Sequence, residues 1–256
     1  MMRHRHLIYL LLAGLLPAAS HAAPVFTPDQ EARIGQIAGD YLLAHPDILV
    51  RVSEKQQQAQ EEQVRAITRK VQDHQTALLR DPGTPAYGPA DAPVSVVEFF
   101  DYQCLVCARQ ASVLSQFMQA PPEVRFVFKE WPIFASRWPV SGQAARTGLQ
   151  TAQQKGADAY LTYHNALFAT GHNEGNLTAD DIRTAARAMK LTAGKGADVS
   201  ATLAGTDELA RTLGLQGTPG LIVMPSRGAT AESITVIPGG TDLATLEQAL
   251  ARATGK

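Results

Sequence analysis

The two cysteines of the chain, Cys104 and Cys107, are its clearest candidates for chemistry. They are three positions apart, and the chain holds no third cysteine with which either could pair. An apolar stretch of strand type, residues 94–100, precedes them, and a stretch of helical type begins at Cys104. The free N–H groups and positive end of a helix stabilise a thiolate, so this placement predicts a nucleophile at Cys104 and a resolving thiol at Cys107.

Three other roles for the cysteines stay open on this evidence. A structural disulfide that closes only two intervening residues constrains the unfolded chain little and would stabilise it weakly. Half of a zinc site would need two further ligands, and the histidines after residue 22 show no paired ligand spacing. Those histidines are His45, His74, His164 and His172. Two thiolates could also hold a soft ion such as Cu(I).

The first 22 residues have the pattern of a secretory signal peptide. Arg3 and Arg5 precede an apolar run over residues 7–16, and small residues lead to a cleavage position after Ala22. The run is about half the roughly 20 apolar residues that a membrane-spanning helix needs. We therefore expect an exported protein in an oxidising compartment, where two cysteines form one disulfide or a working redox pair.

The composition excludes several classes of protein. A hydrophobic content of 45% suits a globular core, and two cysteines are too few for a disulfide-stapled miniprotein. The formal net charge of -1 provides no basic field over the molecule, so we expect no nucleic-acid partner.

Residues 23–80 are expected to form a helical segment. A capping pattern at Thr27 predicts a first helix over residues 28–44, Pro46 interrupts it, and a second helix is expected to run to about residue 79. Composition changes after this segment, because residues 81–92 are dense in proline and glycine and predict a linker.

The second of these helices carries a narrow apolar stripe. Val64, Ile67, Val71 and Leu78 follow a heptad pattern, with His74 at the intervening position. A stripe this narrow on a polar helix needs another surface to bury it. Two partners remain open, the main domain of the same chain or further copies of the segment.

The main domain is expected over residues 93–256. The strand before the cysteines is followed by a helix, another strand, a run of helices, two more strands and a final helix, which is an α/β order. The expected elements after the first strand are a helix at about 104–118, a strand at 124–128, helices between about 140 and 213, strands at 221–224 and 234–237, and a helix from about 242.

Two strings of the main domain resemble a known family. Residues 97–107, VEFFDYQCLVC, are similar to the active-site signature of the DsbA-like thioredoxin family, and residues 217–220, GTPG, to its cis-proline loop. The helical segment resembles the N-terminal oligomerisation segment of ScsC and Com1-type members. The resemblance implies a thioredoxin-like fold with an inserted helical subdomain at about 140–213, preceded by an α-helical arm that assembles a homo-oligomer, a dimer or trimer, through residues 23–80.

The resemblance also implies roles for single residues. Thr218 and Pro219 would bind substrate, because a cis bond between them would bring the Thr218 backbone beside the cysteines. Glu98 corresponds to the family's buried acid and would shuttle a proton from Cys107. A buried carboxylate without a partner is costly, which makes Glu98 a functional candidate. Lys129, at the end of the next strand, is a candidate partner for Glu98.

The expected activity follows from the same comparison. Leu105 and Val106 stand between the cysteines, where strongly oxidising members carry proline and a polar or aromatic residue, so we expect a less oxidising pair. The implied function is a periplasmic protein thiol–disulfide oxidoreductase, more specifically a disulfide isomerase or reductase acting on unfolded or misfolded cysteine-containing proteins. A DsbD/ScsB-like or DsbB-like membrane protein would be its redox partner.

Two alternatives to that activity remain. One is a DsbA-type disulfide oxidase, and the other is a copper-binding or chaperone module that uses the same cysteines. On each of these interpretations we expect no organic cofactor, and on the redox interpretations no resident metal.

Overall fold

The computed structural model describes residues 25–119, 124–191 and 198–255. The expected signal peptide at residues 1–22 lies outside the described residues. The chain divides into two compact units, Met1–Gln56 and Gln57–Lys256, each of which is described by itself.

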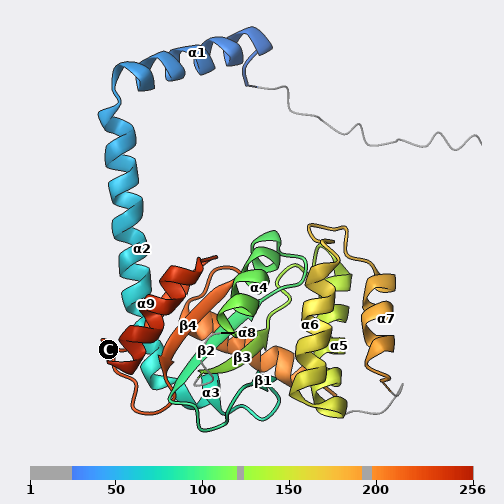
Figure 1. Cartoon of the computed structure of the whole chain (residues 1–256). Coiled ribbons are helices and arrows are strands. Elements are labelled where there is room, and N and C mark those ends of the chain that lie inside the picture. Colours follow the sequence, from blue (N-terminus) through green and yellow to red (C-terminus); the bar gives the residue numbers. More distant parts are fainter. Residues whose placement is uncertain (1–24, 120–123, 192–197, 256) are drawn as a thin grey trace, which may run out of the picture. The chain divides into compact units, whose positions relative to one another are not determined.

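The first unit contains the helix α1, Pro28–Ala44, and the start of α2, Asp47–Asp73 (Figure 1). A capping box begins α1: the Gln30 N–H donates to Thr27 Oγ1 at 3.3 Å, and the Thr27 N–H donates to Gln30 Oε1 at 2.9 Å. No side chain of α1 is buried. The large apolar side chains exposed on these helices are Ile34, Ile37, Tyr41, Leu42, Leu43, Leu49, Val50 and Val52.

The apolar stripe of the second helix packs inside the second unit. The helix ends at Asp73, and α3, Gln75–Leu79, follows it. Ile67, Val71 and Leu78 are buried in a cluster that also holds Phe99 of the sheet. The stripe therefore packs against the main domain of its own chain, and residues 57–79 belong to the second unit.

A five-stranded sheet in the order β1-β3-β2-β4-β5 forms the centre of the second unit. Strands β2 and β3 are parallel, and the other neighbours are antiparallel. The strands are β1 Ala86–Tyr87, β2 Val94–Phe100, β3 Val124–Glu130, β4 Gly220–Pro225 and β5 Thr235–Pro238. The strand β1 lies in the expected linker, where two residues are too few for a periodic pattern.

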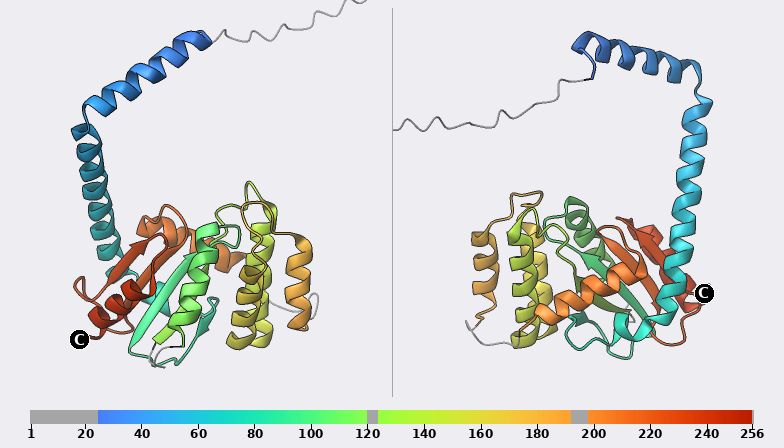
Figure 2. Two further views of the ribbon diagram at one scale, coloured as in Figure 1. Left: turned by 45° about the horizontal axis from the view of Figure 1, so that its top comes forward. Right: turned by 180° about the vertical axis from the view of Figure 1, so that it is seen from behind.

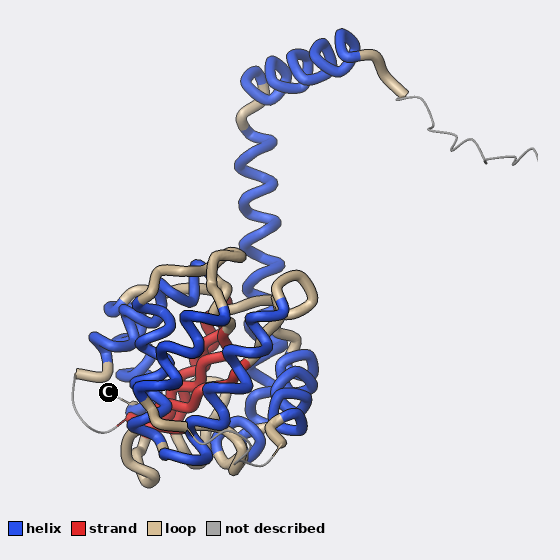
Figure 3. The backbone as a smooth tube through the Cα atoms, turned by 90° about the vertical axis from the view of Figure 1, so that its right-hand side faces the viewer, coloured by secondary structure: helices blue, strands red, loops and turns tan. Residues whose placement is uncertain are grey.

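Helices cover both faces of this sheet (Figure 3). One face, here the α4 face, carries Val96, Phe100 and Phe128 and packs against α4, α6 and α9. The other, here the α8 face, carries Val97 and Phe99 and packs against α2, α3 and α8, as the view from behind shows (Figure 2). The helices not yet given are α4 Leu105–Phe117, α5 Pro139–Lys155, α6 Ala157–Ala169, α7 Ala179–Ala188, α8 Ser200–Leu213 and α9 Leu243–Thr254.

The expected α/β class is confirmed by this arrangement. Helices α5, α6 and α7 pack on one another, and together with α8 they form the helical insertion between β3 and β4. The two cysteines are placed by β2 and α4, which a short turn connects.

Candidate active site

A tight turn between β2 and α4 positions the cysteine pair. Asp101, which directly follows β2, accepts the Gln103 N–H at 2.8 Å and the Ser141 hydroxyl at 2.8 Å. Cys104 then caps α4 in an extended conformation, and its Sγ accepts the Cys107 N–H at 3.4 Å. The first turn of the helix therefore points a free N–H at the Cys104 sulfur.

The loop before β4 brings a second segment to the same place. The Thr218–Pro219 bond is cis, and Cys104 Sγ lies 3.3 Å from the Thr218 carbonyl oxygen, to which it donates when it is protonated. Strand β4 runs antiparallel to β2 with Gly220 opposite Phe99, so this loop lies at the end of the sheet where β2 leads to the cysteines. Residues more than a hundred positions apart are thus in direct contact.

Both cysteines are free thiols, and both are largely covered. Cys104 is 5% exposed and Cys107 is 0% exposed. Cys104 is covered although it begins the helix, because the Thr218 loop lies against its sulfur. The accessible apolar rim is formed by Leu105, which is 38% exposed, and Val106, which is 40% exposed.

The two thiols differ in acidity. The pKa of Cys104 is lowered from 9.0 to about 6, chiefly by a hydrogen bond from the Cys107 side chain, with further support from the Cys107 N–H. The pKa of Cys107 is raised well above its usual value by burial and by the Cys104 sulfur. At neutral pH, Cys104 is therefore a thiolate and Cys107 a thiol.

Glu98 is a buried acid on the α4 face of the sheet, which packs against the two cysteines. It is 2% exposed, and its Oε2 has no hydrogen-bond partner among the described residues. Burial raises the pKa of Glu98 to about 8, with a smaller contribution from the charge of Cys104. Glu98 also raises the pKa of Cys107, so the two groups are coupled electrostatically.

Lys129 does not pair with Glu98, contrary to the expectation from the sequence. Glu98 lies opposite Phe128, and Phe99 lies opposite Lys129. Because successive side chains of a strand point to opposite faces, Glu98 is on the α4 face and Lys129 on the α8 face. The Lys129 ammonium instead donates to Asp81 Oδ2 at 3.2 Å.

Sequence reasoning missed a second buried acid, Glu130. Its Oε1 accepts the Tyr102 hydroxyl at 3.0 Å and the Tyr160 hydroxyl at 2.9 Å. Burial is the first cause that raises its pKa well above the usual value. A charged residue at the end of a strand is typical of an exposed position, so only the alternation along β3 signals that Glu130 shares a face with Phe128.

A groove of about 600 Å³ lies beside the cysteine pair, between α4 and the start of α9. Val106 lines one side of it, and its other lining residues are Arg109, Gln110, Val113, Gly240, Thr241, Asp242 and Thr245. The described part of the chain holds no group of three or more His, Cys, Asp or Glu side chains arranged for a metal ion. The arrangement is suited to thiol–disulfide exchange at Cys104.

Two family models match this chain. The model described as "Thioredoxin" covers residues 80–233, which is more than half of the sequence. The model described as "Copper resistance protein ScsC N-terminal domain" covers residues 30–63. The two matches confirm the resemblance to thioredoxin-fold proteins that carry an ScsC-type segment.

Solved structures support the same family. BcfH of Salmonella enterica Typhimurium is 39% identical with a TM-score of 0.71, and the match covers 89% of this chain and 97% of BcfH. A periplasmic thioredoxin-like protein from Salmonella enterica serovar Typhimurium is 27% identical, with a TM-score of 0.59 and coverage of 71% and 95%. A thioredoxin-like oxidoreductase from Silicibacter pomeroyi is 30% identical, with a TM-score of 0.52 and coverage of 71% and 98%.

A curated relative matches only a part of the chain. A stretch of 100 residues is 30% identical to the Na(+)/H(+) antiporter NhaA 3 of Salinispora tropica, which is 39% of this chain but 14% of the antiporter. None of the helices in the described ranges is both long and apolar enough to cross a bilayer.

The geometry and the comparisons agree on the general chemistry. A cysteine with a lowered pKa at a helix start, a covered second thiol and the adjoining cis-proline loop form an arrangement suited to thiol–disulfide exchange, on a thiol–disulfide oxidoreductase fold. The residues of this site in the sequence, Cys104 to Thr218, lie within the matched range. The chain belongs to the thioredoxin family.

Proposed function

We propose that this chain is a periplasmic protein-disulfide isomerase or reductase, with Cys104 as nucleophile and Cys107 as resolving thiol. The observation that carries the proposal is the difference between the two thiols: the pKa of Cys104 is about 6, whereas that of Cys107 is raised well above 9.0. A pair with one ready thiolate and one protected thiol performs two successive attacks in a defined order.

The exchange begins when the Cys104 thiolate attacks one sulfur of a substrate disulfide. The substrate S–S bond breaks, a mixed disulfide forms, and the leaving substrate sulfur takes up a proton. Cys107 then loses its proton and attacks Cys104 Sγ, which releases the second substrate thiol. The substrate has gained two electrons and two protons, and Cys104 and Cys107 have become a disulfide. An isomerase instead lets a second substrate thiolate resolve the mixed disulfide.

Glu98 is the proposed acceptor of the Cys107 proton. It is buried on the same face of the sheet as Cys107, and its pKa of about 8 lets it exist in both protonation states near neutral pH. Its unpartnered Oε2 leaves one oxygen available to a proton. A thiol with a raised pKa needs such an acceptor at the moment when it attacks Cys104.

The substrate is proposed to be an unfolded or misfolded protein with cysteines. Leu105 and Val106 form an apolar rim beside Cys104, and unfolded chains expose apolar side chains. The backbone of Thr218 lies at the nucleophile, where an extended peptide can pair with it. The groove beside Val106 continues this surface.

The first unit is proposed to join several copies of the chain. Its exposed apolar side chains, Ile37 and Leu43 among them, need a partner surface, and a second copy presents the same side chains. The match to the ScsC N-terminal domain covers this region. Several catalytic domains on one assembly hold a misfolded substrate at more than one point, which favours isomerisation.

Two cysteine variants form a matched pair that tests the chemistry. Cys104→Ala is expected to abolish insulin reduction and the refolding of scrambled ribonuclease, because the nucleophile is lost. Cys107→Ala keeps the nucleophile and is expected to accumulate mixed disulfides with substrate proteins. Full reductase activity in Cys104→Ala refutes the assignment. Cu(I) binding by both cysteines without any reductase activity would favour copper capture instead.

The direction of exchange is tested by the redox state of the pair in the cell envelope. An isomerase or reductase is kept reduced by a membrane thiol donor of the DsbD or ScsB type, so trapping with a thiol-alkylating reagent is expected to find both cysteines reduced. A fully oxidised pair would identify an oxidase served by a DsbB-like partner.

Assembly is tested by the molar mass in solution. Ile37→Glu with Leu43→Glu is expected to convert a dimer or trimer to a monomer, because the charges lie on the exposed apolar side chains of α1. Gln36→Glu is the matched control on the same helix. Light scattering measures the mass, and a monomer before and after the change refutes the proposed assembly.

A further inference from the structure

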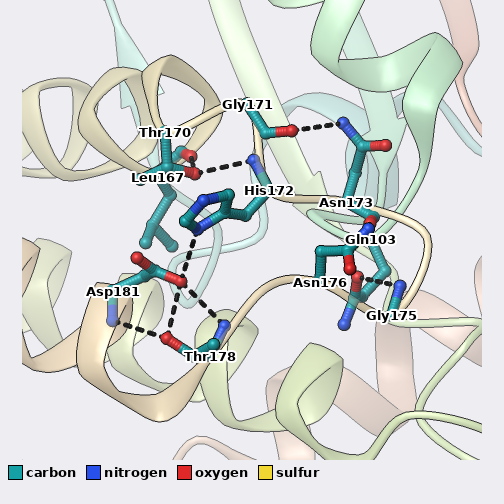
Figure 4. A network of polar contacts seen from close by, with 10 residues as sticks. All are labelled: Gln103, Leu167, Thr170, Gly171, His172, Asn173, Gly175, Asn176, Thr178 and Asp181. Carbon is teal, nitrogen blue, oxygen red and sulfur yellow. Dashed lines mark hydrogen bonds and ion pairs between the residues drawn. The ribbon is translucent and has the colours of Figure 1, made fainter.

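A loop of the helical insertion is attached to the turn that holds the nucleophile. The Glu174 N–H donates to the Gln103 carbonyl oxygen at 2.9 Å. The Gly175 N–H donates to Gln103 Oε1, also at 2.9 Å (Figure 4). Gln103 is fully buried and directly precedes Cys104. The backbone carbonyl oxygen and the side-chain oxygen of Gln103 therefore both connect this loop to the active-site turn.

The same loop places a carboxylate on the start of α4. Glu174 Oε1 accepts the N–H of Leu105, the first residue of the helix, at 3.1 Å. An N–H group further along the same turn serves the nucleophile instead: the Cys107 N–H donates to the Cys104 sulfur at 3.4 Å. The helix start is therefore shared between a thiolate and a carboxylate.

The loop conformation is specific. Glu174 has a φ of 51°, which is uncommon for a residue with a side chain. Gly175 has a φ of 98°, and a Cβ atom there would lie 2.8 Å from Trp138 Nε1, so this position requires glycine. Beyond the loop, His172 contacts Asp181 at the start of α7 (Figure 4). These contacts hold Glu174 in an uncommon backbone conformation, in which its carboxylate reaches the start of α4.

We propose that Glu174 is a positioning residue that limits the reactivity of Cys104 by occupying the first N–H of α4 with a negative charge. A helix start stabilises a thiolate through its free N–H groups and its partial positive charge. A carboxylate that binds one of those N–H groups removes it as a donor to the thiolate. Its negative charge also offsets the partial positive charge of the helix start. The helical insertion thereby makes the pair less oxidising, because a less stable thiolate disfavours the reduced protein.

This role rests on the proposed function, since it concerns the reactivity of the proposed nucleophile. It explains how a pair at a helix start can still be suited to reduction or isomerisation. Leu105 and Val106 place no positive charge beside Cys104, which already favours a less oxidising pair. The negative charge of Glu174 acts in the same direction.

The test compares Glu174→Gln and Glu174→Ala with the unaltered chain. Glu174→Gln keeps an acceptor oxygen for the Leu105 N–H and removes the charge. Its Cys104 thiolate, followed by ultraviolet absorbance during a pH titration, is expected to form at lower pH. The equilibrium with glutathione is expected to shift about two- to tenfold toward the reduced protein, and tenfold corresponds to about 30 mV.

Glu208→Gln is the matched control, because Glu208 is an exposed residue of α8, which covers the other face of the sheet. It removes the same charge and is expected to leave the titration unchanged. An unchanged or higher Cys104 pKa in Glu174→Gln overturns the proposal. Should the alanine variant unfold, the nearly isosteric glutamine variant still decides the question.

The titration and the glutathione equilibrium need no substrate, so they separate the two proposals. If Cys104→Ala abolishes insulin reduction and Glu174→Gln leaves both readouts unchanged, the role of Glu174 fails and the proposed function stands. If Glu174→Gln shifts both readouts but Cys104→Ala retains full activity, the proposed function fails.

Discussion

The two faces of the sheet differ in whether a buried ionisable side chain has a partner of opposite charge. On the α8 face, the Lys129 ammonium is 1% exposed and donates to Asp81, to the Ala77 carbonyl oxygen and to the Thr84 hydroxyl. On the α4 face, Glu98 is buried to almost the same degree and has no cationic partner among the described contacts. Adjacent strands thus carry one compensated and one uncompensated ionisable side chain.

This difference separates a structural group from a candidate functional one. A buried ion with a partner and hydrogen bonds stays charged and connects segments of the chain, here β3 and the segment before β1. A buried acid without a partner has a raised pKa, so it exists in both protonation states near neutral pH and its protonation responds to a change in a neighbouring charge. The α4 face is also the face that packs against the cysteines.

The largest expected effect is on stability, from Lys129→Ala. The change leaves Asp81 without its cation and removes the packing of the lysine stem, so the free energy of unfolding is expected to fall by about 3 kcal/mol. Denaturant unfolding measures it, with Lys129→Met as the control that keeps the stem. The pKa of Cys104 is expected to stay unchanged, and a loss below about 1 kcal/mol would contradict the structural role.

The second prediction concerns the pH dependence of stability in Glu98→Gln. The pKa of Glu98 is about 8 in the fold against 4.5 unfolded, so between these values the folded chain binds more protons and becomes less stable as pH rises. Glu98→Gln lacks this titrating group. With both proteins reduced, the free energy of unfolding of the variant is therefore expected to rise relative to that of the unaltered chain as the pH increases from about 4.5 to 8.

The same variant tests the chemistry of the α4 face. Without a proton acceptor, the attack of Cys107 on the mixed disulfide is expected to slow about tenfold or more. Rapid-mixing measurements of mixed-disulfide decay report this step. A variant with an unchanged decay rate and an unchanged pH profile would show that Glu98 is merely buried.

A smaller effect is expected from Tyr160→Phe, which removes one of the two hydroxyls that donate to Glu130. The loss of one buried hydrogen bond is expected to cost about 1–2 kcal/mol of unfolding free energy. Tyr163→Phe, whose hydroxyl donates to a backbone carbonyl instead, is the control. Equal losses in both variants would show that the tyrosine matters no more to Glu130 than to any buried acceptor.

The smallest shift is expected from Val106→His, which adds a group that can be cationic beside the thiolate. The pKa of Cys104 is expected to fall below about 6, and the equilibrium with glutathione to move severalfold toward the reduced protein. Val106→Gln controls for polarity without charge. A less oxidising histidine variant would contradict the electrostatic account of this face.

Local patterns predicted most of the elements correctly. The apolar run before the cysteines forms β2, and the helix begins at the cysteine pair, because both patterns are contained in a few consecutive residues. The two-residue strand β1 was too short to show a period. The apolar stripe of α2 was visible in the sequence, but a stripe does not identify the surface that covers it.

Predictions about contacts between elements were less accurate. The pairing of Glu98 with Lys129 was wrong because the register of β2 against β3 puts them on opposite faces, and a shift of one residue reverses such an assignment. Glu130 and Glu174 were missed because neither burial at a strand end nor a loop contact between Glu174 and Leu105 leaves a local pattern.

By itself, the sequence determined which atoms the proposed chemistry uses. The spacing of Cys104 and Cys107 at a strand-to-helix turn is a local property, and helix geometry alone directs the Cys107 N–H at Cys104. Only the tertiary structure decided how reactive those atoms are. The Thr218 carbonyl, the Glu98 carboxylate and the Glu174 carboxylate act through burial and distance, which depend on how remote segments pack.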